Sequence, residues 1–206
     1  METLTAAAAP ETPEPPVGTI SSTEDLGLLT SLRTAAFALK RAGIRFALAG
    51  SFAVHARGGP LPEHDVDFFL QPQDRDAAAA ALASTGLRVE QPPLDWLFKA
   101  YDGDRLVDLI HAPMRRPVDL ALLDRADEMD VAALRMPVLS ATDLVVYKLL
   151  TFNEHTCDFA SAIPTARALR EQVDWDVVAA HTAESPFAAV FLDLLGRLEI
   201  TGGADD

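Results

Sequence analysis

The first regular pattern of apolar residues in the chain is a helical one. It follows residues 1–21, which combine Pro, Glu, Thr and Ala without periodicity and which we expect to form a disordered tail. The run Ser22-Thr23-Glu24-Asp25 resembles a helix-capping box, and apolar residues recur after it at helical spacing up to Leu39. Gly43 suits the position that ends a helix. A helix is therefore predicted between Ser22 and Gly43.

Short apolar segments after this helix predict strands that alternate with helices. Residues 45–50 and 64–70 have the composition of buried strands, and a short helix broken by Gly58-Gly59-Pro60 is expected between them. Residues 74–86 are expected to form a longer helix, with an Asp cap at its start and a Gly at its end. Three further strands are expected in LRVE, WLFKAYDG and RLVDLIHAP, with Asp102-Gly103 as the hairpin turn between the last two.

The pattern becomes less regular and then mostly helical in the second half of the chain. Residues 114–131 have the character of a mixed connector, and MPVLS that of a short extended piece. Helical spacing then returns in three segments: 140–155, 163–173 and 176–199, the last interrupted at Pro186. We therefore expect an α/β (α+β) fold, with a mixed sheet and helices over residues 22–115 and a mostly helical C-terminal lobe over residues 116–206.

Composition narrows the class of protein. The net charge of −14 argues against a general nucleic-acid coat protein, because neutralising phosphates requires a basic surface. The single cysteine, Cys157, allows no internal disulfide and fits a reducing compartment. No apolar run approaches the roughly 20 residues that span a bilayer, and the N-terminus lacks a secretory pattern. A cytoplasmic protein without membrane contact is expected.

Two aspartates one residue apart interrupt the predicted strand 64–70. Side chains alternate along a strand, so Asp65 and Asp67 point to the same side and repel each other unless a cation holds them. Asp108 is the odd charge in another apolar strand. Hard divalent ions such as Mg²⁺ prefer carboxylate oxygens, and three converging carboxylates can hold two ions roughly 3.5–4 Å apart. The five histidines show no metal-ligand spacing, so no zinc is expected.

The pair Gly50-Ser51 directly follows the first predicted strand. A glycine at the end of a strand lets the backbone approach a ligand closely. Ser51 then opens the short helix, whose unpaired N–H groups and dipole favour a phosphate. Strand, Gly-Ser turn, helix, a strand with Asp-x-Asp and a later strand with a third Asp together suggest a site for a metal-bound triphosphate.

This arrangement resembles the nucleotidyltransferase superfamily with a palm like that of DNA polymerase beta. Its pattern is matched by Gly50-Ser51, Asp65-Val66-Asp67-Phe68 and Val107-Asp108-Leu109. Within the superfamily, the resemblance is closest to small bacterial nucleotidyltransferases related to the toxins of abortive-infection toxin–antitoxin pairs. Those add a Ser-x-x-Asp-Leu-x-x-x-Lys-Leu motif, matched by residues 140–149, and a downstream Asp, matched by Asp158.

The resemblance implies metal-dependent transfer of a nucleoside monophosphate from an NTP to a hydroxyl group. By resemblance, Asp65 and Asp67 hold two Mg²⁺ ions and Asp108 joins the ion that activates the acceptor hydroxyl. Ser51, with Gly50 beside it, would bind the NTP phosphates.

The resemblance also assigns roles in the helical lobe and implies partners. Lys148 would lie near the triphosphate or the acceptor, and Asp158 would orient the acceptor side. The acceptor stays open between a protein, a tRNA 3′ end or other RNA, and a small molecule, and the strong acidity favours a protein or small molecule over RNA. A toxin would also have an antitoxin partner.

Two other functions stay open. Many relatives have a basic residue and a Ser or Thr before the Asp pair, where this chain has Glu63 and His64, with Arg57 as a substitute for the basic residue. A degenerate domain that serves as a binding or regulatory module is therefore one alternative. The other is an HD-type phosphohydrolase, with His64-Asp65 as its dyad and His55 and Asp158 as further ligands. HD proteins carry the dyad on a helix, however, and residues 64–70 have strand composition.

Overall fold

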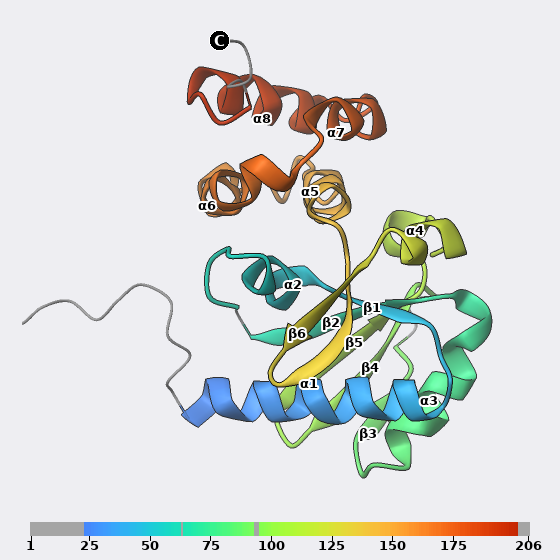
Figure 1. Ribbon diagram of the computed structural model, residues 1–206. Helices are drawn as coiled ribbons and strands as arrows, with labels where there is room; N and C mark the ends of the chain where they lie inside the picture. Colours follow the sequence, from blue (N-terminus) through green and yellow to red (C-terminus); the bar gives the residue numbers. More distant parts are fainter. Residues whose placement is uncertain (1–22, 63, 93–94, 202–206) are drawn as a thin grey trace, which may run out of the picture.

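A seven-stranded mixed sheet organises the part of the chain that the structure describes, residues 23–62, 64–92 and 95–201 of a computed structural model (Figure 1). Its strands are β1 (Phe46–Ala49), β2 (Asp65–Leu70), β3 (Arg88–Glu90), β4 (Leu97–Asp102), β5 (Arg105–Ile110), β6 (Asp127–Val131) and β7 (Leu134–Val138). They are ordered β3-β4-β5-β2-β1-β7-β6. The pairs β2–β5 and β1–β7 are parallel and the others are antiparallel. The expected α/β class with a mixed sheet is confirmed.

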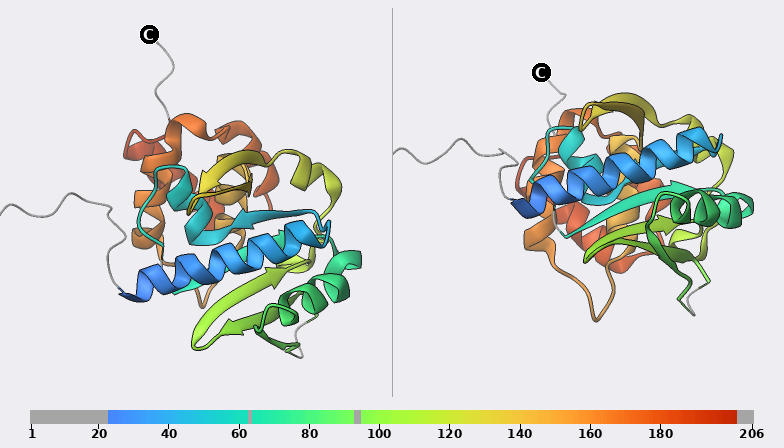
Figure 2. Two further views of the ribbon diagram at one scale, coloured as in Figure 1. Left: turned by 60° about the horizontal axis from the view of Figure 1, so that its bottom comes forward. Right: turned by 90° about the horizontal axis from the view of Figure 1, so that it is seen from below.

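Helices cover both faces of this sheet. They are α1 (Thr23–Arg41), α2 (Gly50–Ala56), α3 (Arg75–Ala83), α4 (Leu120–Asp124), α5 (Ala141–Leu150), α6 (Phe159–Leu169), α7 (Trp175–His181) and α8 (Pro186–Arg197), with short 3₁₀ turns at η1 (Pro72–Asp74), η2 (Pro113–Arg115) and η3 (Arg170–Gln172). Figure 2 shows α1 and α3 lying across the strands on one face. The C-terminal helices lie on the other side, with α5 and α6 between the sheet and the pair α7 and α8 (Figure 1). Among the described residues, no helix combines the length and the apolar character needed to cross a membrane.

The alternation of β2 explains which face carries the chemistry. Val66, Phe68 and Leu70 are completely buried and belong to the same hydrophobic cluster as Leu32 and Leu39 of α1. Their burial removes apolar surface from water on the α1 side of the sheet. Since neighbouring residues of a strand point to opposite faces, the two aspartates of β2 point away from α1, toward the C-terminal helices.

The C-terminal helices enclose a second hydrophobic cluster. The rings of Phe152, Phe159 and Phe191 pack against one another with centroids 5.1–5.6 Å apart. Each of α5–α8 begins at a side-chain cap that accepts a hydrogen bond from a backbone N–H three residues later; these caps are Ser140, Asp158, Asp174 and Ser185. Such caps satisfy N–H groups that the helix itself leaves unpaired.

The predicted elements are mostly observed, with three corrections. Residues 114–131 are not an irregular connector, because they contain α4 and β6, and the sheet continues to Val138. The turn of the β6–β7 hairpin consists of Ala132 and Ala133, both with positive φ, where Gly or Asn is usual, and the sequence therefore carries no turn signal. The sheet thus extends past residue 115, the predicted end of the α/β part. The boundary between the two hydrophobic clusters lies near residues 139–144 instead.

The other two corrections concern element ends. Asp102 pairs with Arg105 as the last residue of β4, so the predicted hairpin turn is shifted by one residue, to Gly103 and Asp104. The third correction concerns the segment between α5 and α6: α5 ends at Leu150, five residues before the predicted end, and α6 begins at Phe159, four residues before its predicted start. The predicted tail 1–21, the capping residue Ser22 and Glu63 lie outside the described residues.

Candidate active site

Three carboxylates from two neighbouring strands meet on the side of the sheet that faces the C-terminal helices. Asp65 and Asp67 lie on β2, and Asp67 is directly opposite Asp108 of the parallel strand β5. One oxygen from each carboxylate lies within 4.8 Å of the others. The structure therefore brings together the three residues that the sequence pattern singled out.

Repulsion among the three carboxylates favours the binding of a cation. Burial, and then the negative charges of Asp65 and Asp108, raise the pKa of Asp67 to about 7. Burial and the charge of Asp108 also raise the pKa of Asp65. A divalent ion would remove this repulsion, and carboxylate oxygens are the ligands that Mg²⁺ prefers, so the residues present fit such an ion.

Lys99 completes the cluster and was not predicted. It lies on β4 directly opposite Asp108, and its Nζ donates to both carboxylate oxygens of Asp108, at 3.0 and 3.1 Å. Asp67, Asp108 and Lys99 thus form one row across β2, β5 and β4 on a single face of the sheet. A lysine in the mainly apolar strand LFKAYD was the available sequence signal, but only the strand register reveals its partner.

Gly50 is the position where the backbone lies closest to the triad. It follows β1 with φ of +58°, and a Cβ built on it would lie 1.8 Å from Oδ2 of Asp67. Only glycine fits this contact, because any larger residue would displace the carboxylate. Ser51 follows at the start of α2 and lines the adjacent cavity. The predicted Gly-Ser pair is therefore placed next to the predicted Asp pair.

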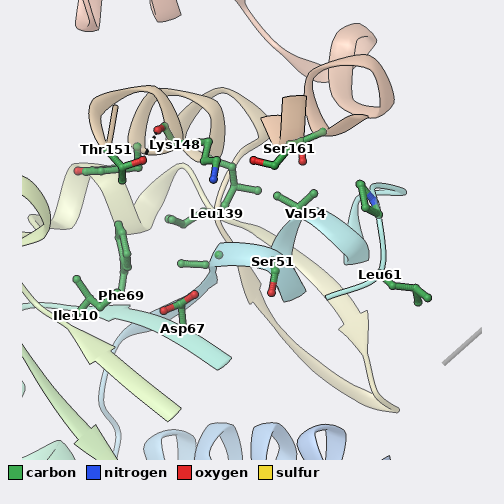
Figure 3. A pocket seen from close by; sticks show the side chains of 16 residues that line it. Ser51, Val54, Leu61, Asp67, Phe69, Ile110, Leu139, Lys148, Thr151 and Ser161 are labelled. Carbon is green, nitrogen blue, oxygen red and sulfur yellow. Dashed lines mark hydrogen bonds between the residues drawn. The ribbon is translucent and has the colours of Figure 1, made fainter. Parts of the chain in front are cut away.

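A cavity of about 380 Å³ opens between the sheet, α2 and the helices α5 and α6 (Figure 3). Asp67 and Ser51 line its sheet side, and Lys148, Thr151 and Ser161 line its helical side. Much of the remaining wall is apolar; it includes Val54, Leu61, Phe69, Ile110, Leu139 and Leu144. An apolar chamber with a few convergent polar groups is the usual form of a small-molecule site.

The predicted residues of the C-terminal helices differ in their placement. Lys148 lines the cavity from α5, and Figure 3 shows its side chain extending toward the space above Asp67. Asp158 is exposed, and its carboxylate accepts the backbone N–H of Ser161 at 3.2 Å as the cap of α6. It is not among the described residues that line the cavity.

Two other members of the Ser-x-x-Asp motif support the helix that carries Lys148. Ser140 Oγ accepts the backbone N–H of Asp143 at 3.0 Å and donates to its carboxylate at 2.6 Å. The Asp143 carboxylate also accepts from Nε and Nη2 of Arg125, at 3.1 and 2.8 Å. This network joins the end of α4 to the start of α5 and so fixes the helix on the cavity wall.

Arg57 and His55, which the sequence suggested as neighbours of the Asp pair, have other partners. Arg57 Nε donates to the carbonyl oxygen of Leu139 at 2.7 Å, and its Nη2 donates to Asp127, so the hypothesis that it substitutes for a basic residue beside the triad is wrong. His55 Nδ1 lies 3.3 Å from the carbonyl oxygen of Gly59. Asp65 begins a strand rather than lying on a helix, which excludes the hypothesis of an HD-type phosphohydrolase.

Comparison with solved structures finds proteins with a similar fold. No protein-family model and no curated protein matches the sequence. The solution structure of the antibiotic-resistance factor ANT(2″)-Ia is similar, with 19% identity and a TM-score of 0.57 over 83% of this chain and 94% of that one. A crystal structure of ANT(2″)-Ia with adenylyl-2″-tobramycin has the same identity and TM-score over 81% and 97%. The lincosamide antibiotic adenylyltransferase LnuA is 13% identical with a TM-score of 0.48, over 66% of this chain and 92% of that one.

Proposed function

Because the chain has the nucleotidyltransferase fold, we propose that it transfers a nucleoside monophosphate from an NTP to a hydroxyl group of an acceptor. The observation that carries the proposal is the convergence of Asp65, Asp67 and Asp108 within 4.8 Å, beside a cavity lined by Gly50 and Lys148. In-line displacement at phosphorus requires positioning and charge neutralisation rather than covalent chemistry from the protein. A carboxylate triad next to a polar-edged cavity meets both requirements.

The residues divide between the two substrates according to the strand order. Gly50, Ser51 and Lys148 line the part of the cavity beside β1, α2 and α5, and we assign this part to the NTP. Two Mg²⁺ ions held by the triad would neutralise the phosphates and polarise the α-phosphate. Asp108 lies on the opposite side of β2, on β5, and we assign it to the acceptor hydroxyl. Asp158, exposed at the start of α6, would orient the acceptor from the helical lobe.

The proposed reaction balances without a further reactant. The acceptor oxygen forms a bond to the α-phosphorus, and the bond between the α-phosphorus and the bridging oxygen of the β-phosphate breaks. Pyrophosphate leaves with that electron pair, and the proton of the acceptor hydroxyl passes to solvent water. The chain contributes the carboxylates that orient both oxygens and Lys148, which would stabilise negative charge on the phosphates.

We further propose that the acceptor is a small molecule or a protein rather than RNA. The net charge of −14 repels a polyanion at long range and attracts cationic compounds. ANT(2″)-Ia has been crystallised with adenylyl-2″-tobramycin, which supports an aminoglycoside as the first small molecule to test. An antitoxin partner and a cytoplasmic location remain predictions from the sequence.

Label transfer tests the function directly. Purified protein is incubated with Mg²⁺ and each α-³²P-labelled NTP, with an aminoglycoside panel, total protein and total RNA as separate acceptors. We expect transfer by the wild type and a loss of at least about 10³-fold in the Asp65→Asn/Asp67→Asn double variant. The matched control, Asp176→Asn/Asp193→Asn, changes two aspartates of α7 and α8 and should retain activity.

The same assay distinguishes the degenerate-domain alternative. A module that has lost catalysis would bind no Mg²⁺–NTP and transfer no label to any acceptor. Binding of Mg²⁺–NTP without transfer to any of the three pools would direct the search to other small hydroxyl compounds. Transfer that survives in the Asp65→Asn/Asp67→Asn variant would contradict the assignment of the site.

A further inference from the structure

Lys99 forms an ion pair with Asp108, the carboxylate on which binding of a second metal ion would depend. Its Nζ lies 3.0 and 3.1 Å from the two oxygens of Asp108, so both of them are already paired with a positive charge. The pair is sheltered, with 26% of the Lys99 side chain and 11% of the Asp108 side chain exposed. Sheltered charge pairs are weakly screened by water and salt, so this contact is not an incidental surface pair.

The strand register makes the contact a property of the fold rather than of one side-chain rotamer. Lys99 and Asp108 are directly opposite each other on β4 and β5, and Asp108 is directly opposite Asp67 on β2. Among the described residues, Lys99 is the one lysine or arginine that forms an ion pair with any of the three carboxylates. Its positive charge offsets part of the rise in the pKa values of Asp65 and Asp67 that burial and the neighbouring carboxylates cause.

The net charge of the three carboxylates and Lys99 indicates how many divalent ions the cluster can bind. With all three carboxylates ionised and one ammonium group beside them, the cluster has a net charge of −2, which one divalent cation neutralises. Among the described residues, no lysine or arginine forms an ion pair with Asp65 or Asp67, so these two carboxylates are available to a divalent ion. A second divalent ion would have to compete with the Lys99 ammonium for Asp108, and two ions would give the cluster a net charge of +2 with Lys99 present but only +1 without it.

We propose that Lys99 acts as a built-in cation that holds Asp108 in place and limits the nucleotide-free protein to one divalent ion, on Asp65 and Asp67. A second ion then enters only with the triphosphate, whose negative charge compensates it. Lys99 is a positioning residue, since it acts through Asp108. This inference rests on the proposed function, because it concerns the ions that nucleotide transfer requires.

Counting bound Mn²⁺ tests the inference without any activity measurement. Mn²⁺ alone is titrated into the full chain without nucleotide, and the free ion is followed by electron paramagnetic resonance. We expect the wild type to bind one Mn²⁺ per chain and the Lys99→Met variant to bind two. Lys40→Met removes a lysine of α1 that donates to the carbonyl oxygen of Arg135, and it should keep the wild-type stoichiometry.

Thermal unfolding in EDTA provides a second readout. Lys99→Met leaves three carboxylates without their cation, so its midpoint should fall by about 3–6 °C relative to the wild type. Adding Asp108→Asn to this variant removes the uncompensated charge and should restore most of the loss. A merely structural lysine would give no recovery in the double variant, because its lost packing would remain.

The outcomes separate this inference from the function on which it rests. Two Mn²⁺ ions per chain in the wild type, or one in Lys99→Met, would overturn the role of Lys99 while label transfer by the wild type still supported the function. The wild-type stoichiometry decides the matter even if Lys99→Met does not fold. A wild type that binds no Mn²⁺ and transfers no label would overturn both.

Discussion

The backbone of Gly50 lies directly against the carboxylate of Asp67. A Cβ at Gly50 would lie 1.8 Å from Oδ2 and 2.8 Å from Cγ of Asp67, well inside van der Waals contact. The positive φ of +58° adds a second requirement for glycine at the same position. One residue therefore links the end of β1 to the orientation of a candidate metal ligand on β2.

Gly50→Ala is expected to damage both stability and metal binding. The new methyl group must move the Asp67 carboxylate and the backbone must hold an unfavourable φ, so we expect a loss of about 2–4 kcal/mol in the free energy of unfolding. Mn²⁺ affinity should fall about 10–100-fold, as for other changes that misplace a metal ligand. Urea unfolding and Mn²⁺ titration measure the two effects.

Gly43→Ala is the matched control for this prediction. Gly43 also has a positive φ, +69°, but a Cβ there would meet nothing within 4 Å. Its cost should be about 1 kcal/mol from backbone strain alone, with Mn²⁺ affinity unchanged. Equal effects of the two substitutions on metal binding would contradict the contact between Gly50 and Asp67.

The raised pKa of Asp67 predicts how metal-free stability depends on pH. Its value is about 7 in the folded chain and 3.8 in the unfolded reference, so the folded state binds more protons between these values and stability falls as pH rises through them. At about 1.4 kcal/mol per pKa unit, the destabilisation contributed at pH 8 is at most about 4 kcal/mol. Urea unfolding in EDTA from pH 4.5 to 8 measures it.

Asp67→Asn isolates this contribution. The variant should be more stable than the wild type at pH 8 in EDTA, and the difference should shrink toward pH 4.5, where Asp67 of the wild type is protonated. Saturating Mg²⁺ should stabilise the wild type more than the variant at pH 8. A difference that stayed constant with pH would show that Asp67 is not protonated in the metal-free fold.

Lys148→Met should weaken the binding of Mg²⁺–NTP. If Lys148 contacts the triphosphate across the cavity, the lost charged hydrogen bond is worth about 1.5–3 kcal/mol, or about 10–100-fold in the dissociation constant. Calorimetric titration with each NTP measures this. Lys148→Arg keeps the charge and should lose less, whereas unchanged affinity in Lys148→Met would place the phosphates elsewhere.

Asp143→Ala should destabilise the protein, since Asp143 connects α4 to α5. It is buried, and it accepts from two nitrogens of Arg125 and from Ser140, so its removal should cost about 2–3 kcal/mol in urea unfolding. Asp193 forms an exposed ion pair with Arg197 within α8, and Asp193→Ala should change stability by no more than about 0.5 kcal/mol. Similar losses in the two variants would mean that the buried network contributes no more than a surface pair.

The local part of the site follows from the sequence alone. Alternation within β2 is a covalent property of an extended chain, so residues 65 and 67 share a face in any fold that keeps the strand. The positive φ of Gly50 and the Ser140 cap of α5 are likewise local, because they depend on backbone geometry within a few residues. These features were predictable because no distant partner is needed to specify them.

Only the tertiary structure decided which residues meet across the strands. Lys99 faces Asp108 because β4 pairs with β5 in one register, and a shift of one residue would turn Lys99 to the opposite face. Arg57 binds β6 and β7 instead of the triad because the Ala132–Ala133 turn folds a hairpin that carries no sequence signal. The pKa of Asp67 also depends on burial by segments far away in the chain. Sequence thus determined the ligands, whereas strand register and long-range packing determined the charge that surrounds them.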